Sequence, residues 1–112
     1  MTKIIHRVIF LKPLGGIMKY KNDIIQEAVN KGNRFIILEP QEVFNKSIME
    51  FHEEEGRLVY EVDALLECLR EHYDWDSVEA LEWFDYNVFD LTFMDKGPIF
   101  YDKFEEKYLT IE

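Results

Sequence analysis

The sequence predicts an α+β domain, with a small mixed, mainly antiparallel sheet and two to three helices packed on one face. Three observations support this class. Short runs rich in Ile, Val and Phe lie between turn residues, as strands do. Three segments combine helical apolar spacing with capping residues. The elements follow the order β-α-β-turn-β-β-α-α-β, in which strands and helices do not alternate regularly.

The length of 112 residues corresponds to one domain, 1–112. Nine Phe, six Tyr and two Trp supply enough large side chains for a core, which argues against disorder. A single cysteine, Cys68, excludes an internal disulfide and fits a reducing cytosol. No apolar run reaches the roughly 20 residues of a membrane span. We therefore expect a cytoplasmic protein.

The first strand is predicted within residues 2–11, which are rich in Ile and Val. After a Pro/Gly-rich break, Asn22 is placed to cap a helix that ends before Gly32, a residue suited to the C′ position. Glu27 and Lys31 stand four residues apart on this helix and are expected to pair.

The middle of the chain predicts a buried strand, a short turn and a hairpin. Residues 34–39 form an apolar run that stops at a proline, and residues 41–46 predict one helical turn. Residues 47–52 and 57–62 predict two antiparallel strands. Gly56 between them suits a turn position with positive φ.

Two helices and a last strand are predicted in the C-terminal part. Asp63 is expected to cap the first helix. Asp76 caps the second, and Glu79 three residues later completes a capping box. This second helix is expected to reach about Phe89. Residues 97–102 predict the last strand, followed by an acidic, aromatic tail.

The helix that starts at Asp76 raises the question of which side is buried. At about 100° per residue, one side carries the predicted core stripe Val78, Leu81, Phe84 and Val88, with Ala80 and Asn87 on its flank. The opposite side carries Glu79, Glu82, Tyr86 and Asp90, with Trp83 on the border. Trp and Tyr are enriched at binding hot spots. The alternative is that Trp83 covers the sheet and Asn87 caps a backbone group.

Charge is unevenly distributed along the chain. The net charge is −10, composed of +5 in residues 1–34 and −15 in residues 35–112. An acidic body disfavours direct nucleic-acid binding and permits binding to a basic protein surface. The alternative is that the acids serve only solubility.

A resemblance adds a biological context. Residues 56–90 and 96–102 carry an "EAxEWxxYN" helix followed by a strand with Pro-Ile, and they resemble a family of small proteins from tailed phages and prophages of Gram-positive bacteria. The match covers about the C-terminal two-thirds of the chain and departs after the helix, at "VFDLTFMDKG". It implies a phage product in the host cytoplasm and no catalytic residue. The matching residues are Gly56, Val59, Tyr60, Leu66, Glu79, Ala80, Glu82, Trp83, Tyr86, Asn87, Gly97, Pro98 and Ile99.

Sites of chemistry are scarce in the sequence. There is no Gly-rich phosphate loop. Cys68 and His72 have a spacing that can present two metal ligands, but no second pair follows, and Cys68 is expected to be a small buried residue. His52 precedes three glutamates, a group that suits a hard cation or acid–base chemistry but fits a solvated hairpin turn more simply. We expect no catalytic residues, metal or cofactor.

Three functional hypotheses follow. The first is an accessory protein that binds and inhibits a host nuclease or defence protein, as anti-CRISPR or anti-restriction proteins do. Its acids would imitate nucleic-acid phosphates, and its predicted contacts are Glu79, Glu82, Trp83, Asp85, Tyr86 and Asp90. The second is a binder of a small molecule or nucleotide signal, which would need a closed cavity with basic lining. The third is a small enzyme that uses the His52 cluster, favoured by a small pocket lined with carboxylates and His. The first is preferred, with no membrane contact.

The start of the product is a further expectation. Residues 15–18, Gly-Gly-Ile-Met, are compatible with codons that contain a ribosome-binding sequence just before the Met18 codon. The native product is therefore hypothesised to begin at Met18, with residues 1–17 as an extension. The alternative is that these residues form an edge strand, because an apolar segment rarely stays unpaired.

Overall fold

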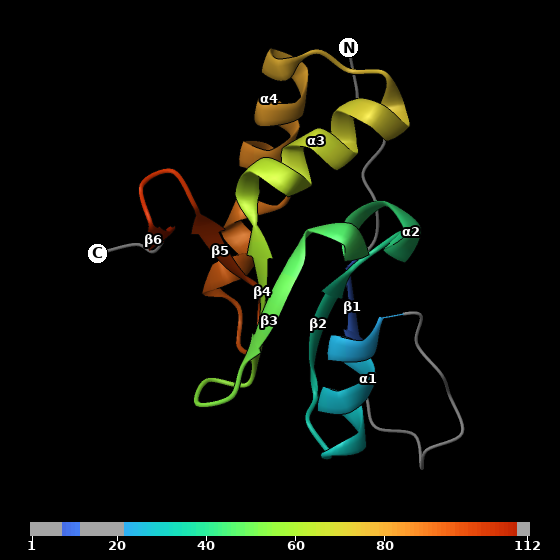
Figure 1. Ribbon diagram of the computed structural model, residues 1–112, viewed down its shortest axis with the longest axis vertical. Helices are drawn as coiled ribbons and strands as arrows, with labels where there is room; N and C mark the ends of the chain where they lie inside the picture. Colours follow the sequence, from blue (N-terminus) through green and yellow to red (C-terminus); the bar gives the residue numbers. More distant parts are fainter. Residues whose placement is uncertain (1–7, 12–21, 110–112) are drawn as a thin grey trace.

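A computed structural model describes the backbone of residues 8–11 and all atoms of residues 22–109 (Figure 1). The elements of this part of the chain are β1 (Val8–Leu11), α1 (Asp23–Asn30), β2 (Phe35–Leu38), α2 (Gln41–Phe44), η1 (Asn45–Ser47), β3 (Ile48–His52), β4 (Arg57–Glu61), α3 (Val62–Tyr73), α4 (Ser77–Asn87), η2 (Phe89–Phe93), β5 (Ile99–Asp102) and β6 (Lys107–Leu109). Here η1 and η2 are 3₁₀-helices. The predicted α+β class is confirmed.

The strands form two sheets among the described residues, whereas the sequence predicted one. The larger has the order β3-β4-β5-β6, in which only β4 and β5 are parallel, so it is mixed and mainly antiparallel. The smaller is the antiparallel pair β1-β2. The predicted hairpin of β3 and β4 is confirmed, and Gly56 turns it with φ of 70°.

The pairing of β1 with β2 bears on the expected late start at Met18. Val8–Leu11 pairs in register with Phe35–Leu38, as the edge-strand alternative requires. Residues 1–7 and 12–21 lie outside the described residues, so the rest of the proposed extension is not described. The sheet that contains β2 therefore includes a strand that a product starting at Met18 would lack.

One hydrophobic core joins the elements and holds the two sheets together. All four residues of β2 are buried, and so is Tyr60 on β4. The Leu38 amide donates a hydrogen bond to the Tyr60 hydroxyl at 3.1 Å, and the Ile36 amide donates to the carbonyl of Lys96 at 3.0 Å. Buried backbone donors need such partners, so the first bond fixes β2 to β4 of the larger sheet and the second fixes it to the turn before β5.

Local capping signals in the sequence agree with the structure at α1 and α4. The Asn22 side chain accepts the Ile25 amide at 3.0 Å, and Gly32 follows the helix with φ of 89°. Asp76 and Glu79 form the predicted capping box, with bonds of 2.8 and 3.1 Å.

Two local expectations are wrong. α3 begins at Val62, and Glu61 caps it by accepting the amides of Asp63 and Ala64, because its longer side chain reaches both; Asp63 lies in the first turn. The predicted acidic tail contains β6, which pairs with β5 through Tyr101 opposite Tyr108. Its alternation is too short to mark a strand in the sequence.

The buried side of α4 also differs from the prediction. Val78 and Leu81 were predicted in the core but are 64% and 48% exposed. The buried residues are Ala80, Trp83, Phe84 and Val88, so the buried side is rotated towards Ala80 and Trp83 by somewhat less than the roughly 100° that separates successive residues. The placement of Phe84 and Val88 is confirmed. Burying the large ring of Trp83 removes more apolar surface from water than burying Val78, which explains the rotation.

Candidate functional site

Three of the six predicted contact residues lie exposed on α4: Glu82, Asp85 and Tyr86. The side chain of Tyr86 is 83% exposed. Asp90 is also exposed, but it lies in η2 beyond the end of the helix. The structure thus brings together part of the predicted surface, centred on the second half of α4.

Trp83 is not available as an anchor, which corrects the prediction. It is only 3% exposed, and its ring stacks on Phe44 with centroids 6.2 Å apart and an interplanar angle of 18°. On another side it meets Trp75 at 6.0 Å. Trp83 is therefore buried, as the alternative interpretation required, but it joins α2 to α4, whereas that interpretation placed it over the sheet.

Glu79 has mainly a structural position. It is half-buried, and its carboxylate accepts the Asp76 amide in the capping box. Asn87 donates from its side chain to the Trp83 carbonyl at 3.1 Å, so it caps a backbone group near the helix end, as its alternative predicted. These intramolecular hydrogen bonds explain the presence of Glu79 and Asn87 in the "EAxEWxxYN" motif without requiring a binding partner.

Two residues that the sequence reasoning missed complete the surface of α4. Val78 and Leu81 stand one turn apart, next to Glu82 and Asp85, and positions i, i+3, i+4 and i+7 share one side of a helix. We call Val78, Leu81, Glu82, Asp85 and Tyr86 the α4 face. A signal for it was present: taking Ala80 and Phe84, four residues apart, as the centre of the buried side places these five residues away from that centre.

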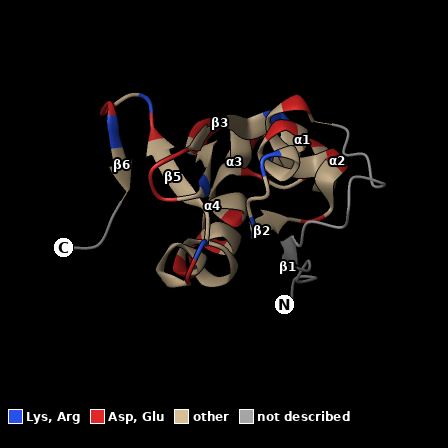
Figure 2. Ribbon diagram, turned by 90° about the horizontal axis from the view of Figure 1, so that it is seen from below, with Lys and Arg blue, Asp and Glu red and all other residues tan. Residues whose placement is uncertain are grey.

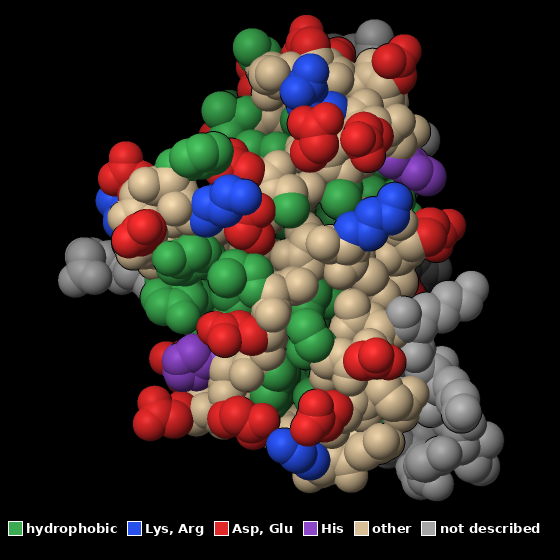
Figure 3. All heavy atoms as spheres, in the orientation of Figure 1, with side chains coloured by type: hydrophobic (Ala, Val, Ile, Leu, Met, Phe, Trp, Pro, Cys, Tyr) green, Lys and Arg blue, Asp and Glu red, His purple; other side chains and the backbone are tan. Residues whose placement is uncertain are grey.

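The α4 face combines apolar and negatively charged side chains. Figure 3 shows a few exposed hydrophobic side chains at the end of the molecule where α4 lies and a larger group beside β5 and β6. Acidic residues are not confined to this face: Figure 2 shows them on α1, α2 and α4 and near hairpin ends, with a few basic residues between them. The expected flat acidic face is therefore replaced by an apolar face with carboxylates, on a body that is acidic throughout.

The His52 cluster forms a hairpin turn with a small recess beside it. The recess has a volume of about 110 Å³ and is lined by His52, Glu55, Arg57, Thr92, Ile99 and Tyr108. His52 Nδ1 accepts the Glu55 amide at 3.3 Å, and the Glu55 carboxylate pairs with the Arg57 guanidinium at 3.3 Å. Small-molecule sites usually enclose about 300–1,000 Å³. The polar groups of this recess thus serve the turn, although His and a carboxylate do meet there, as the enzyme hypothesis requires.

Cys68 and His72 line a second recess, together with Glu42, Val43, Lys46 and Glu71. Burial raises the pKa of the Cys68 thiol, which keeps it protonated and poorly nucleophilic at neutral pH. Among the described residues, no group of three or more His, Cys, Asp or Glu side chains is arranged to hold a metal ion. Cys68 is partly buried against the core, less deeply than expected.

Comparison with known proteins adds no further information about this surface. No protein-family model, curated protein or solved structure matches the chain. Across residues 8–11 and 22–109, no helix has the length and apolar character needed to cross a membrane.

Proposed function

We propose that this protein acts by binding another protein through the α4 face. The observation that carries the proposal is the exposure of Val78, Leu81 and Tyr86 at 64%, 48% and 83% on one side of a single helix. Exposed apolar groups that cluster rather than scatter mark interaction sites, and Tyr is a frequent anchor in them. A well-capped helix presents such groups at fixed spacing, which lowers the entropic cost of binding.

The partner proposed for this face is a basic protein. Glu82 and Asp85 lie between the apolar groups, and the chain has a net charge of −10. Opposite charge raises the rate of encounter and favours surfaces that bind nucleic acid, since these are basic. The finer proposal is a phage accessory protein in the host cytoplasm that inhibits a host nuclease or defence protein. The charge and the resemblance of the C-terminal two-thirds to phage proteins support it.

A pull-down comparison tests the role of the α4 face. The native protein and a Leu81→Ser/Tyr86→Ala variant are used as baits in a lysate of a Gram-positive bacterium. Phe104→Ala is the matched control, because Phe104 is 77% exposed in the turn between β5 and β6. We expect a partner that the native protein and the control retain and the double variant loses. Retention of the same proteins by all three baits would contradict the proposal.

Salt dependence tests the charge of the partner. For the captured protein, we expect the affinity to fall by about tenfold or more between 50 and 500 mM salt, because screening weakens contacts between exposed charges. The Glu82→Gln/Asp85→Asn variant should bind more weakly at low salt and respond less to added salt. An affinity that does not change with salt rules out a charge-steered contact.

A further inference from the structure

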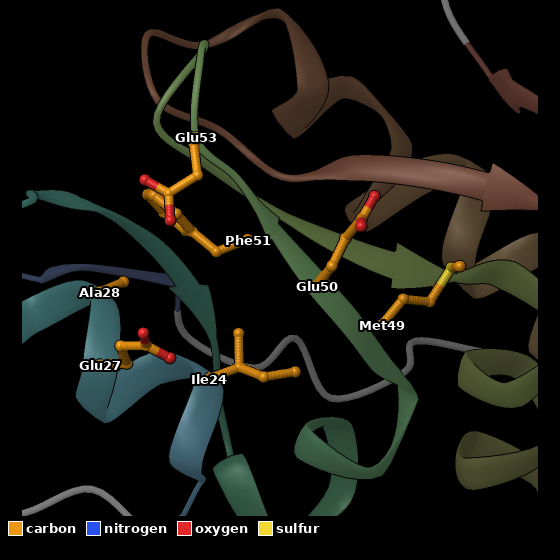
Figure 4. A pocket seen from close by; sticks show the side chains of 7 residues that line it. All are labelled: Ile24, Glu27, Ala28, Met49, Glu50, Phe51 and Glu53. Atoms are coloured by element: carbon orange, nitrogen blue, oxygen red, sulfur yellow. The ribbon is translucent and has the colours of Figure 1, made fainter.

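A groove opens between α1 and β3, away from the α4 face (Figure 4). Its volume is about 230 Å³, below the usual size of a small-molecule site, so it suits a side chain of a partner better than a cofactor. Apolar groups supply much of its surface: Ile24 and Ala28 from α1, and Met49 and Phe51 from β3. Figure 3 shows hydrophobic side chains in a strip along this part of the surface.

A cationic group already lies beside this apolar surface. The Lys31 ammonium is 3.5 Å from the Glu27 carboxylate and 3.4 Å from that of Glu53, and both glutamates line the groove. The hydrogen bond with Glu53 is the main cause that raises the pKa of Lys31, so the ammonium is charged at neutral pH. The side chain of Lys31 is 51% exposed, and an exposed pair of this kind contributes little because water screens it. Another cation can therefore replace it.

The groove follows an open edge of the larger sheet. β3 is the first strand in the order β3-β4-β5-β6, so no described strand pairs with its outer side. Successive side chains of a strand point to opposite faces, and the groove is lined by both Glu50 and Phe51. It therefore runs along the edge, where an extended segment can lie. A bulge between Ile48 and Glu50 limits the regular part of the edge to Glu50–His52.

We propose that the α1–β3 groove binds an extended segment of a partner protein in which one apolar side chain is flanked by Lys or Arg. The apolar side chain contacts Ile24, Ala28 and Phe51, and a flanking cation takes the place of Lys31 between Glu27 and Glu53. Lys31 acts as an internal competitor. This proposal does not depend on the α4 face, because α1 and α4 lie toward opposite ends of the long axis (Figure 1).

Charge complementarity selects this occupant over an acidic or neutral one. Two carboxylates of the groove, those of Glu27 and Glu53, lie beside the Lys31 ammonium, which offsets only one of their two negative charges. Glu50 also lines the groove, but its carboxylate points away from α1 (Figure 4) and accepts a hydrogen bond from the Tyr108 hydroxyl of β6 at 3.4 Å. A segment with basic residues on both sides of its apolar residue meets negative charge from both α1 and β3.

An NMR titration of the whole chain locates the site. The probe is a blocked pentapeptide, Lys-Lys-Leu-Lys-Lys, added to ¹⁵N-labelled protein at low salt. We expect amide shifts concentrated in residues 23–31 and 48–53. The same peptide with Gly in place of Leu should bind about tenfold more weakly, because it buries no apolar side chain. Shifts centred on 77–87, or equal binding of the two peptides, would overturn the proposal.

Variants distinguish peptide binding in the groove from nonspecific attraction of a basic peptide to an acidic protein. Lys31→Gln should tighten peptide binding about two- to fivefold, and Glu27→Gln/Glu53→Gln should weaken it by about the same factor. The matched control is Glu67→Gln/Glu71→Gln, which removes two exposed carboxylates from α3 and changes the net charge equally. Equal weakening by both double variants, or no gain with Lys31→Gln, would refute the role of the groove. Urea unfolding of each variant checks that the fold is retained. The chemical-shift changes of the native protein locate the binding site even if a variant fails to fold.

Discussion

Gly97 is expected to be the glycine least tolerant of substitution among those that the structure describes. A Cβ atom added to it would lie 1.9 Å from the Leu91 carbonyl oxygen, and 3.1 Å from that of Met94. Both are backbone atoms of the segment that contains η2, so no side-chain rotation removes the overlap. Relief requires η2 to move away from the turn that leads into β5. Gly97→Ala should therefore destabilise the protein without altering any surface charge.

The size of the effect follows from the kind of overlap. Extra atoms in a packed core typically cost about 1–3 kcal/mol when side chains can adjust. Here the backbone must shift, so we expect Gly97→Ala to lower the free energy of unfolding by about 3 kcal/mol or more. A domain of this length has a total stability of roughly 6–17 kcal/mol. The loss corresponds to a fall in Tm of about 10–20 °C.

Urea unfolding followed by tryptophan fluorescence measures the change, with circular dichroism for the thermal transition. Gly32→Ala is the matched control, because Gly32 has a φ of 89° and nothing within 4 Å of the added Cβ. Gly32→Ala should lower the free energy of unfolding by only about 1–2 kcal/mol, because alanine disfavours the left-handed backbone conformation at this position. If Gly97→Ala is no more destabilised than Gly32→Ala, the close approach of Leu91 does not constrain the fold as argued.

Three further predictions concern the core and the first strand. Trp83→Ala should lower the free energy of unfolding by about 3–5 kcal/mol, and an unchanged urea midpoint would show that Trp83 is not part of the core. Burial raises the pKa of Tyr60 above its ordinary value of 10.0, so the native stability that depends on its neutral hydroxyl is present below pH 10 and is lost above it, by up to about 1.4 kcal/mol per pH unit. Tyr60→Phe should reduce this slope and lower the free energy of unfolding by about 1–3 kcal/mol because the Leu38 amide loses its acceptor, and a slope unchanged in the variant would contradict this. A chain of residues 18–112 lacks β1 and should be less stable than the full chain by more than about 2 kcal/mol in thermal and urea melts, and equal stability would show that β1 is dispensable.

The parts of the fold that the sequence predicted well depend on neighbouring residues. Asn22, Gly56 and the pair Asp76 and Glu79 each act within three or four residues, so their side chains and backbone angles follow from local rules. The parallel pairing of β4 with β5 was not predicted. It joins residues far apart in the chain, and no pattern within either strand specifies the partner.

The candidate site was only half predictable for the same reason. The period of α4 limits its buried side to a few choices, but Phe44 and Trp75 decide among them, and both come from other elements. Tyr86 was predicted to be exposed, and it is. The α1–β3 groove depends on α1 lying beside β3, which local patterns in two separate segments do not reveal.

The parallel pairing of β4 and β5 also has a consequence for synthesis of the chain. Val59 pairs with Ile99, so β4 leaves the ribosome forty residues before the strand that covers one of its edges. At about 5–20 residues per second, this interval lasts about 2–8 seconds. During it the nascent hairpin of β3 and β4 presents an apolar strand edge, of the kind that recruits other unfolded chains. Synthesis of β5, rather than early hairpin formation, is therefore the step that allows this edge of β4 to be covered.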